Sequence, residues 1–291
     1  MKVLSLNILL FLASTSGAIP VSGTNEFSSS YGTKPAAWNA GTVTQFPIHS
    51  SCNATQRRQI EMGLSETVLI AAHARDHILR WRNESEIYRK YFRDSPSMEA
   101  LGAYDTVIDG NKSNVLFRCD DPDGNCNIEG YAGHWRGENG TDQTVICDLS
   151  YETRRSLSTM CALGYTVAGS ETNTFWAADL LHRLYHMPSF GQNWIDHFAD
   201  GYEEVVDQAI ENATLSTRDS ETLQYFALEV YAYDIAIPGE GCPGKPHTHD
   251  KETSSQPTSA SAKITAEAPS TINDVPKVSH NFPNGRALKL T

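Results

Sequence analysis

Positive charge is scarce in this 291-residue chain. Lysine and arginine number 23 against 35 acidic residues, which gives a formal net charge of −12. A protein that binds the phosphate backbone needs a positive surface, so the composition argues against nucleic acid as a partner, whereas an acidic surface attracts cations. Aromatic residues make up 9% and charged residues 20% of the chain. This composition is typical of a globular protein rather than a fibrous or wholly disordered one.

Long apolar runs are also missing, apart from one at the N-terminus. Met1-Lys2 is followed by mostly apolar residues as far as Ala13, and Ser16-Gly17-Ala18 provides small residues before a cleavage site. This pattern predicts a secretory signal peptide over residues 1–18, too short to anchor the chain in a membrane. No later stretch of about 18 residues is apolar, so we expect no transmembrane segment.

Several catalytic and binding motifs are absent. The sequence contains no Cys-x-x-Cys pair, no glycine-rich phosphate loop and no Gly-x-Ser-x-Gly elbow, which argues against a thiolate zinc cluster and a serine hydrolase. The segment 121–125 begins like a calcium loop. It has Cys126 where that loop needs glycine and Ala132 where it needs glutamate, so we interpret it as a turn held by a disulfide.

Cysteines and glycosylation sequons agree with secretion. Six cysteines in an oxidising compartment predict three disulfides with 15 open pairings, and Cys119 and Cys126, which flank a short turn, are expected to form a local bridge. Full pairing would leave no thiol nucleophile. Five Asn-x-Ser/Thr sequons predict a glycoprotein whose modified asparagines lie on the surface. The cysteines are Cys52, Cys119, Cys126, Cys147, Cys161 and Cys242, and the asparagines are Asn53, Asn83, Asn111, Asn139 and Asn212.

The chain divides by composition into an irregular Ser/Thr/Gly-rich leader over 19–45, one domain over 46–242, and a Ser/Thr/Pro-rich tail over 243–291 that is expected to be disordered. Within the domain, hydrophobic periodicity predicts helices and a small sheet, which together make an α+β fold. We expect helices at 55–81, 85–92, 151–162, 173–186, 194–212 and 220–233, and strands at 105–108, 115–118 and 144–149, the first two joined by a hairpin turn at Asp109-Gly110.

The sharpest chemical signal is a pair of histidines, His182 and His186. They stand four residues apart on a predicted helix, so their rings project from one face about 5–6 Å apart and can share one zinc ion. Asp179, one turn earlier, is expected to accept a hydrogen bond from the second ring nitrogen of a ligand. Pro188 permits a turn, so that the following helix returns His197 as the third ligand.

Other residues are open as the third ligand. Asp200 is the first substitute for His197, and Glu203 and Glu204 on the following helix are further options. The alternative to a metal site is a partly buried helix face on which the histidines only make hydrogen bonds.

The residue between the two histidines limits the chemistry. In HExxH metallopeptidases the glutamate takes a proton from zinc-bound water. Arg183 occupies that position here, and a guanidinium is always protonated and cannot be a base. General-base catalysis contributes roughly 10²–10⁴-fold. The sequence therefore supports zinc binding and not peptide hydrolysis.

Five more histidines differ in how well they could bind a metal. His73 and His77 repeat the i,i+4 spacing and are either a second metal site or a hydrogen-bonded helix face. His134 is interpreted as a structural or surface residue. His247 and His249 in the tail would bind zinc only weakly, because two ligands on a flexible segment do not make a tight site.

Several ordered strings then resemble the fungal zincophore family, which includes the pH-regulated antigen of Candida and a major secreted allergen of Aspergillus, with the greater likeness expected to the Candida member. They span about residues 46–242 and include Ala72-His-Ala-Arg-Asp-His77, Phe175-Trp-Ala-Ala-Asp-Leu-Leu-His-Arg-Leu-Tyr-His186 and His197-Phe-Ala-Asp200. The resemblance implies a zincin-like, deuterolysin-related fold with HRxxH in place of HExxH, secretion, extracellular or cell-wall localisation, and zinc scavenging. It also implies delivery to a cell-surface zinc transporter and contact with host complement and leukocyte receptor proteins. The tail departs from the Candida pattern, because it has no cysteine after Cys242.

Ligand chemistry predicts a pH dependence. Histidine binds zinc only when neutral, and its free pKa is near 6.5, so three free imidazoles would lose roughly 10⁴ in affinity at pH 5 relative to alkaline medium. The rival functions are an active zinc metallopeptidase with Asp179 or Glu203 as the base, and a cell-wall or adhesive glycoprotein with structural histidines. A homo-oligomer is left open.

Overall fold

The computed structural model describes residue 37 and residues 39–245. The predicted signal peptide and the tail histidines His247 and His249 lie outside the described residues. Within the described range the chain divides at Thr42 into two units, and the second is compact. The second unit contains all the elements below, and its first backbone contacts join Val43 to Asn111 and Lys112.

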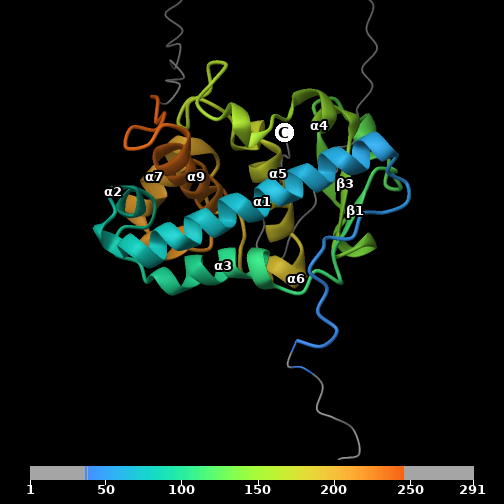
Figure 1. The fold of residues 1–291 in the computed structure, drawn as a ribbon, viewed down its shortest axis with the longest axis horizontal. Helices are drawn as coiled ribbons and strands as arrows, with labels where there is room; N and C mark the ends of the chain where they lie inside the picture. The colour runs from blue at the N-terminus through green and yellow to red at the C-terminus, as the bar shows by residue number, and fades with distance from the viewer. Residues whose placement is uncertain (1–36, 38, 246–291) are drawn as a thin grey trace, which may run out of the picture. The chain divides into compact units, whose positions relative to one another are not determined.

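Helix α1 (Ala54–Trp81) is the longest element and crosses the unit (Figure 1). Asn53 starts it with a capping box, because its side chain accepts hydrogen bonds from the N–H groups of Thr55 and Gln56 while the Gln56 side chain accepts one from the N–H of Asn53. Apolar residues recur at helical spacing on the face that packs against α3 (Ser97–Asp109), α5 (Trp176–Tyr185) and α9 (Ser220–Tyr231). The helix expected at 55–81 is confirmed.

A glycine permits the close contact between α1 and α5. A Cβ on Gly63 would lie 2.8 Å from Cδ1 of Leu180 and 2.9 Å from Cβ of Trp176, so only glycine fits without a shift of α5. The Thr67 hydroxyl, one turn later, donates to the carbonyl of Ala177 at 3.1 Å. These contacts fix α5, which carries the histidine pair, against the longest helix.

The remaining helices complete the core. Phe226 of α9 lies at its centre, with four aromatic rings at centroid distances of 5.0–6.3 Å, and packing of this kind contributes most of a domain's stability. The rings belong to Tyr88, Tyr91, Phe92 and Tyr104. The further helices are α2 (Glu86–Phe92), α4 (Asp148–Thr153), α6 (Pro188–Gly191), α7 (Gly201–Glu211) and α8 (Ala213–Ser216), with a π-helical turn at Ala232–Ala236.

A three-stranded sheet lies beside the helices (Figure 1). Its order is β1 (Leu116–Arg118), β3 (Gln143–Ile146), β2 (Gly133–Trp135); β1 runs parallel and β2 antiparallel to the central strand. A mostly helical unit with a small sheet confirms the α+β class predicted from the sequence.

Three secondary-structure predictions are wrong. Residues 105–108 belong to α3, because Ala100, Tyr104 and Val107 recur at helical spacing and are buried, and the Asp109-Gly110 step ends this helix instead of forming a hairpin turn. The predicted helix at 151–162 is limited to α4 and a 3-10 turn at Leu157–Thr159. The predicted helix at 194–212 begins only at Gly201, so residues 194–200 are irregular.

All six cysteines are paired, as predicted, in the bridges Cys52–Cys119, Cys126–Cys147 and Cys161–Cys242. The expected local bridge between Cys119 and Cys126 is wrong. The Asp121 carboxylate accepts hydrogen bonds from the N–H groups of Asn125 and Cys126, and this turn directs Cys126 toward Cys147 at the end of β3.

The predicted glycosylation sites lie on the surface. The five sequon asparagines, Asn53, Asn83, Asn111, Asn139 and Asn212, are all exposed, which leaves them open to modification. Among the described helices, none is long and apolar enough to cross a membrane.

Candidate metal centre

Helix α5 presents His182 and His186 on one side. Leu180, Leu181 and Leu184 on the other sides of the helix are buried in the core, so the polar pair is left at the half-buried edge. The two rings lie 4.6 Å apart between centroids, which confirms the predicted juxtaposition on one helix face.

His197 joins the pair from the irregular segment before α7 and not from a helix, which corrects the predicted mode of its return. The buried carboxylate of Asp219 holds this segment, because Oδ1 accepts hydrogen bonds from the N–H groups of Phe198 and Ala199 at 2.7 and 3.1 Å. Asp196 extends the attachment through backbone hydrogen bonds with Arg218 and Ser220.

The three Nε2 atoms converge on one point. Nε2 of His186 lies 3.0 Å from Nε2 of His182 and 3.0 Å from Nε2 of His197. One nitrogen from each ring lies within 4.8 Å of the others. Three imidazoles bound tetrahedrally to zinc at 2.0–2.1 Å place their nitrogens about 3.4 Å apart, so small ring movements would admit the ion. The donor set fits zinc and leaves a fourth position for water.

Gln224 sets the tautomer of His182. Its amide N–H donates to the carbonyl of Ala178 at 2.9 Å, which turns the amide oxygen toward Nδ1 of His182 at 3.0 Å. An oxygen acceptor there requires a proton on Nδ1, so the Nε2 lone pair faces the centre of the cluster. The Ser220 hydroxyl lies 3.3 Å from Nδ1 of His197. The ring of Trp135 stacks on the ring of His186, with 6.4 Å between the ring centroids.

Sequence reasoning missed these supporting residues. A signal was present: the Asp219 side chain caps α9 by accepting from the N–H of Thr222, a recognisable N-terminal pattern. Ser220 and Gln224 then stand four residues apart on one face of α9, the spacing that the two ligands also have on α5.

Burial keeps the cluster neutral. Burial, and next the neighbouring His197, lower the pKa of His182 to about 3. Burial, and then His182 and His197, hold the pKa of His186 well below its usual value. Burial also lowers the pKa of His197, against the opposing charges of Asp196 and Asp200. Neutral imidazoles are the form that ligates metal.

Asp179 does not support a ligand ring, contrary to the prediction. Its carboxylate accepts from Nε of Arg183 at 2.8 Å and from Arg154 at 3.1 Å, and all three side chains are at most 7% exposed. Arg183 also lies beside Gly133, where a Cβ would come within 2.4 Å of Nη1, so the sheet closes around the guanidinium. Arg183 is therefore a buried structural ion and takes no position in the cluster.

The substitute ligands lie outside the cluster. Asp200 lies directly before α7, where its N–H donates to the Glu204 carboxylate and its side chain makes no capping hydrogen bond, and Glu203 is exposed on the first turn. Among the described residues, no carboxylate oxygen belongs to the group formed by the three histidines.

The second histidine pair meets a carboxylate instead of a third ring. Nε2 of His73 and Nδ1 of His77 lie 3.0 and 2.8 Å from the same oxygen, Oδ2 of Asp234. Nε2 of His77 also lies 2.8 Å from the Ser85 hydroxyl. The sequence had offered no third donor for this pair, and Asp234 from the π-helical turn supplies one.

A protein-family model of the HRXXH family, described as "Putative peptidase family", matches residues 3–245. The chain belongs to this family. It is 69% identical over 215 residues to the major allergen Asp f 2 of Aspergillus fumigatus, covering 74% of this chain and 69% of the allergen. It is 54% identical over 215 residues to the pH-regulated antigen PRA1 of Candida albicans, covering 74% and 72%.

The predicted relationship to these antigens is confirmed, but the expectation of greater likeness to the Candida member is wrong, since the identity to the Aspergillus allergen is higher. Among solved structures, a zinc peptidase from Grifola frondosa aligns with a TM-score of 0.46 at 14% identity, covering 61% of this chain and 97% of the peptidase.

Proposed function

We propose that this chain is a secreted zinc-binding glycoprotein that captures extracellular zinc at neutral to alkaline pH through His182, His186 and His197. The observation that carries the proposal is the convergence of three Nε2 atoms, two of them 3.0 Å from the third. The Gln224 contact supports it, because a neutral ring with its lone pair directed inward is ready to bind. When bound, zinc would hold a water molecule at its fourth position.

Capture is favoured over catalysis by the chemistry around the cluster. Arg183 and Asp179 form a buried ion pair, so neither can exchange a proton with a water molecule at the three rings. Glu203, the other base considered, is exposed on α7. The rival function is a peptidase with a non-standard base, and the family's printed description is consistent with it.

The lowered histidine pKa values widen the pH range over which the three-histidine cluster can bind zinc. Free imidazoles with a pKa near 6.5 would lose roughly 10⁴ in zinc affinity at pH 5. In the folded cluster protons compete less, because burial disfavours the charged rings. Zinc would therefore be retained into mildly acidic medium, and release would need stronger acid or a competing ligand.

Asp234, His73 and His77 are a second, weaker candidate for zinc. The carboxylate and the two rings supply three donors of types that zinc accepts, but the rings meet through the carboxylate oxygen instead of facing each other. The tail histidines His247 and His249 would add weak binding only.

Secretion, cell-wall association and the partners belong to the same proposal. Three disulfides, five exposed sequons and relatives named as antigens and an allergen are consistent with an extracellular protein. Delivery to a cell-surface zinc transporter and contact with host complement or leukocyte receptor proteins are further proposals from the family resemblance.

Zinc per chain tests capture. We expect about one tightly bound zinc in the full secreted chain by elemental analysis after dialysis, and its loss in the His182→Ala/His186→Ala variant. His49→Ala, which changes a half-buried histidine outside both clusters, should keep the ion. The zinc content of a His73→Ala/His77→Ala variant shows how much of the metal is bound at the second site. Unchanged zinc in the His182→Ala/His186→Ala variant would contradict the proposal.

A peptidase assay with added zinc tests the rival. We expect no zinc-dependent cleavage of an unfolded protein substrate by the wild-type chain. Cleavage that disappears in the His182→Ala variant would instead identify the chain as a peptidase.

A further inference from the structure

A second group of metal-binding atoms surrounds one of the disulfides. Cys126 follows the turn at Asp121, Cys147 directly follows β3, and His134 stands on β2, the neighbouring antiparallel strand. The two sulfur atoms and one ring nitrogen of His134 lie within 4.8 Å of one another. This group shares no residue with the three-histidine cluster.

His134 carries an unused ring nitrogen. Its Nε2 lies 3.2 Å from the Asp123 carboxylate, which Arg136 fixes with hydrogen bonds of 2.8 and 3.1 Å. An acceptor at Nε2 requires the proton there and leaves a lone pair on Nδ1. Nδ1 has no hydrogen-bond partner among the described residues, and the side chain is 4% exposed. A buried polar atom without a partner is unfavourable, so a group that engages Nδ1 would gain free energy.

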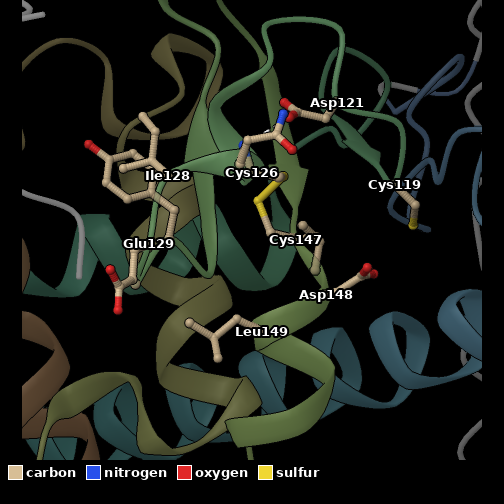
Figure 2. Close-up of a pocket in the computed structure, with 12 residues that line it drawn as sticks. Cys119, Asp121, Cys126, Ile128, Glu129, Cys147, Asp148 and Leu149 are labelled. Atoms are coloured by element: carbon tan, nitrogen blue, oxygen red, sulfur yellow. Dashed lines mark hydrogen bonds between the residues drawn. A yellow bond between two sulfur atoms is a disulfide. The ribbon is translucent and has the colours of Figure 1, made fainter. Parts of the chain in front are cut away.

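The disulfide borders a cavity of about 510 Å³. Figure 2 draws Cys126 and Cys147 among the lining residues together with the carboxylates of Asp121, Glu129 and Asp148. Cys126 is only half-buried. A small reductant and a cation can therefore approach the bridge from the cavity, and the acidic lining attracts the cation.

We propose that reduction of the Cys126–Cys147 disulfide opens a Cys₂His site for a thiophilic divalent cation such as zinc or cadmium. Two electrons from a phosphine or dithiol reductant cleave the S–S bond and leave two thiols. With a phosphine, water supplies the two thiol protons and the oxygen of the phosphine oxide. The cation then binds both sulfurs as thiolates, with release of two protons, and accepts the Nδ1 lone pair of His134.

The fold can accommodate this change. Zinc–sulfur distances near 2.3 Å separate two tetrahedral thiolates by about 3.8 Å, a small displacement from a bridged pair. The bridge spans 21 residues in sequence, against 67 and 81 for the other two. Breaking this bridge therefore raises the conformational entropy of the unfolded chain the least, while Cys52–Cys119 and Cys161–Cys242 still constrain the unit.

Cadmium binding to the full chain under mild phosphine reduction tests the site. We expect one additional cadmium per chain, with thiolate-to-cadmium charge-transfer absorption, and protection of Cys126 and Cys147 from alkylation in peptide mass spectrometry. Imidazole ligands give no such absorption, so the result is independent of the proposed zinc capture. No additional cadmium, or cadmium that protects other cysteines, would overturn the proposal, including where reduction unfolds the chain.

Variants assign the ligands. Cys126→Ser/Cys147→Ser should abolish the absorption, whereas Cys161→Ser/Cys242→Ser, the matched control, should keep it. His134→Ala should weaken cadmium binding by at least the 10–100-fold that loss of a supporting contact costs. Absorption that persists without Cys126 and Cys147 would overturn the site, and unchanged affinity in His134→Ala would remove His134 from it. If the serine variant does not fold, the alkylation pattern of the wild-type chain shows whether Cys126 and Cys147 bind the cadmium.

Discussion

The amide oxygen of Gln224 lies 3.0 Å from Nδ1 of His182, and the amide nitrogen of the same side chain donates to the carbonyl of Ala178. The second contact fixes the orientation of the amide, and the first fixes the proton on the ring. A residue on α9 thus determines which nitrogen of an α5 histidine is available to a metal.

Replacing Gln224 with leucine should weaken zinc binding without removing a ligand. We expect the affinity to fall about 10–100-fold in a competition titration, because the ring loses the acceptor that holds its tautomer. The metal content at saturating zinc should stay unchanged. Gln59→Leu, a half-buried glutamine on α1, is the control. Equal affinities of Gln224→Leu and wild type would disprove the role of the amide.

The metal-free chain should lose stability in acid because of the three clustered histidines. The pKa values of these histidines are lowered in the folded state, to about 3 for His182. Below about pH 6.5 the histidines of the unfolded chain therefore become protonated while those of the folded cluster stay neutral. Their contribution to stability is thus complete above that pH and is lost as the pH falls toward the folded-state values. Each histidine contributes at most about 1.4 kcal/mol per pH unit.

Urea unfolding of the metal-free protein between pH 7 and pH 5 measures this effect. The slope should be shallower in a variant that carries His182→Gln, His186→Gln and His197→Gln. Identical slopes in variant and wild type would show that the rings titrate freely in the folded chain.

Glu221 should destabilise the protein at alkaline pH. Burial raises the pKa of its carboxyl to about 8, partly offset by a hydrogen bond from the Gly201 N–H. The folded carboxyl therefore holds a proton that the unfolded chain has released, and the stability present below about pH 4.5 is lost as the pH rises through 8.

Glu221→Gln, which mimics the protonated group, should raise the free energy of unfolding by about 1–3 kcal/mol at pH 8 and leave it almost unchanged at pH 4. Glu211→Gln on the exposed end of α7 is the control. A variant that is less stable than wild type at pH 8 would refute the raised pKa.

Arg183→Leu should damage the fold and not the metal site. The change leaves the buried carboxylate of Asp179 with Arg154 alone, and breaking a buried ion pair costs about 3–5 kcal/mol. Denaturant unfolding should show this loss, while zinc per chain under native conditions stays at the wild-type value. Arg58→Leu, on the exposed face of α1, should change stability little. Loss of zinc from folded Arg183→Leu would contradict a purely structural role.

The sequence predicted the parts of the site that depend on local periodicity. His182 and His186 are four residues apart on an amphipathic helix, so their common face followed from helical geometry. His197 was identified by proximity in sequence, but its irregular segment is held by Asp219, a contact across 20 residues that no local pattern reveals. Gln224 shares a face of α9 with Ser220, but it was missed because helical spacing does not show which other helix that face contacts.

Two errors have a common physical cause. The Asp109-Gly110 step suits both a hairpin turn and a helix end, and only the buried face of α3 decides between them. Asp179 lies one turn before His182, as a supporting carboxylate would, but it pairs with Arg183 one turn later on the same helix and with Arg154 from the segment after α4. Local spacing is compatible with the Asp179–Arg183 pair, but it could not predict the contact with Arg154 or the packing of α3.

An anomalous-scattering map at the zinc edge, from crystals of the zinc-loaded protein, tests zinc binding by the three-histidine cluster most directly. We predict a single strong peak about 2.0–2.1 Å from Nε2 of His182, His186 and His197, with a fourth position open to water. A map with no peak between these rings, or with zinc only at His73 and His77, would contradict zinc binding by the three-histidine cluster.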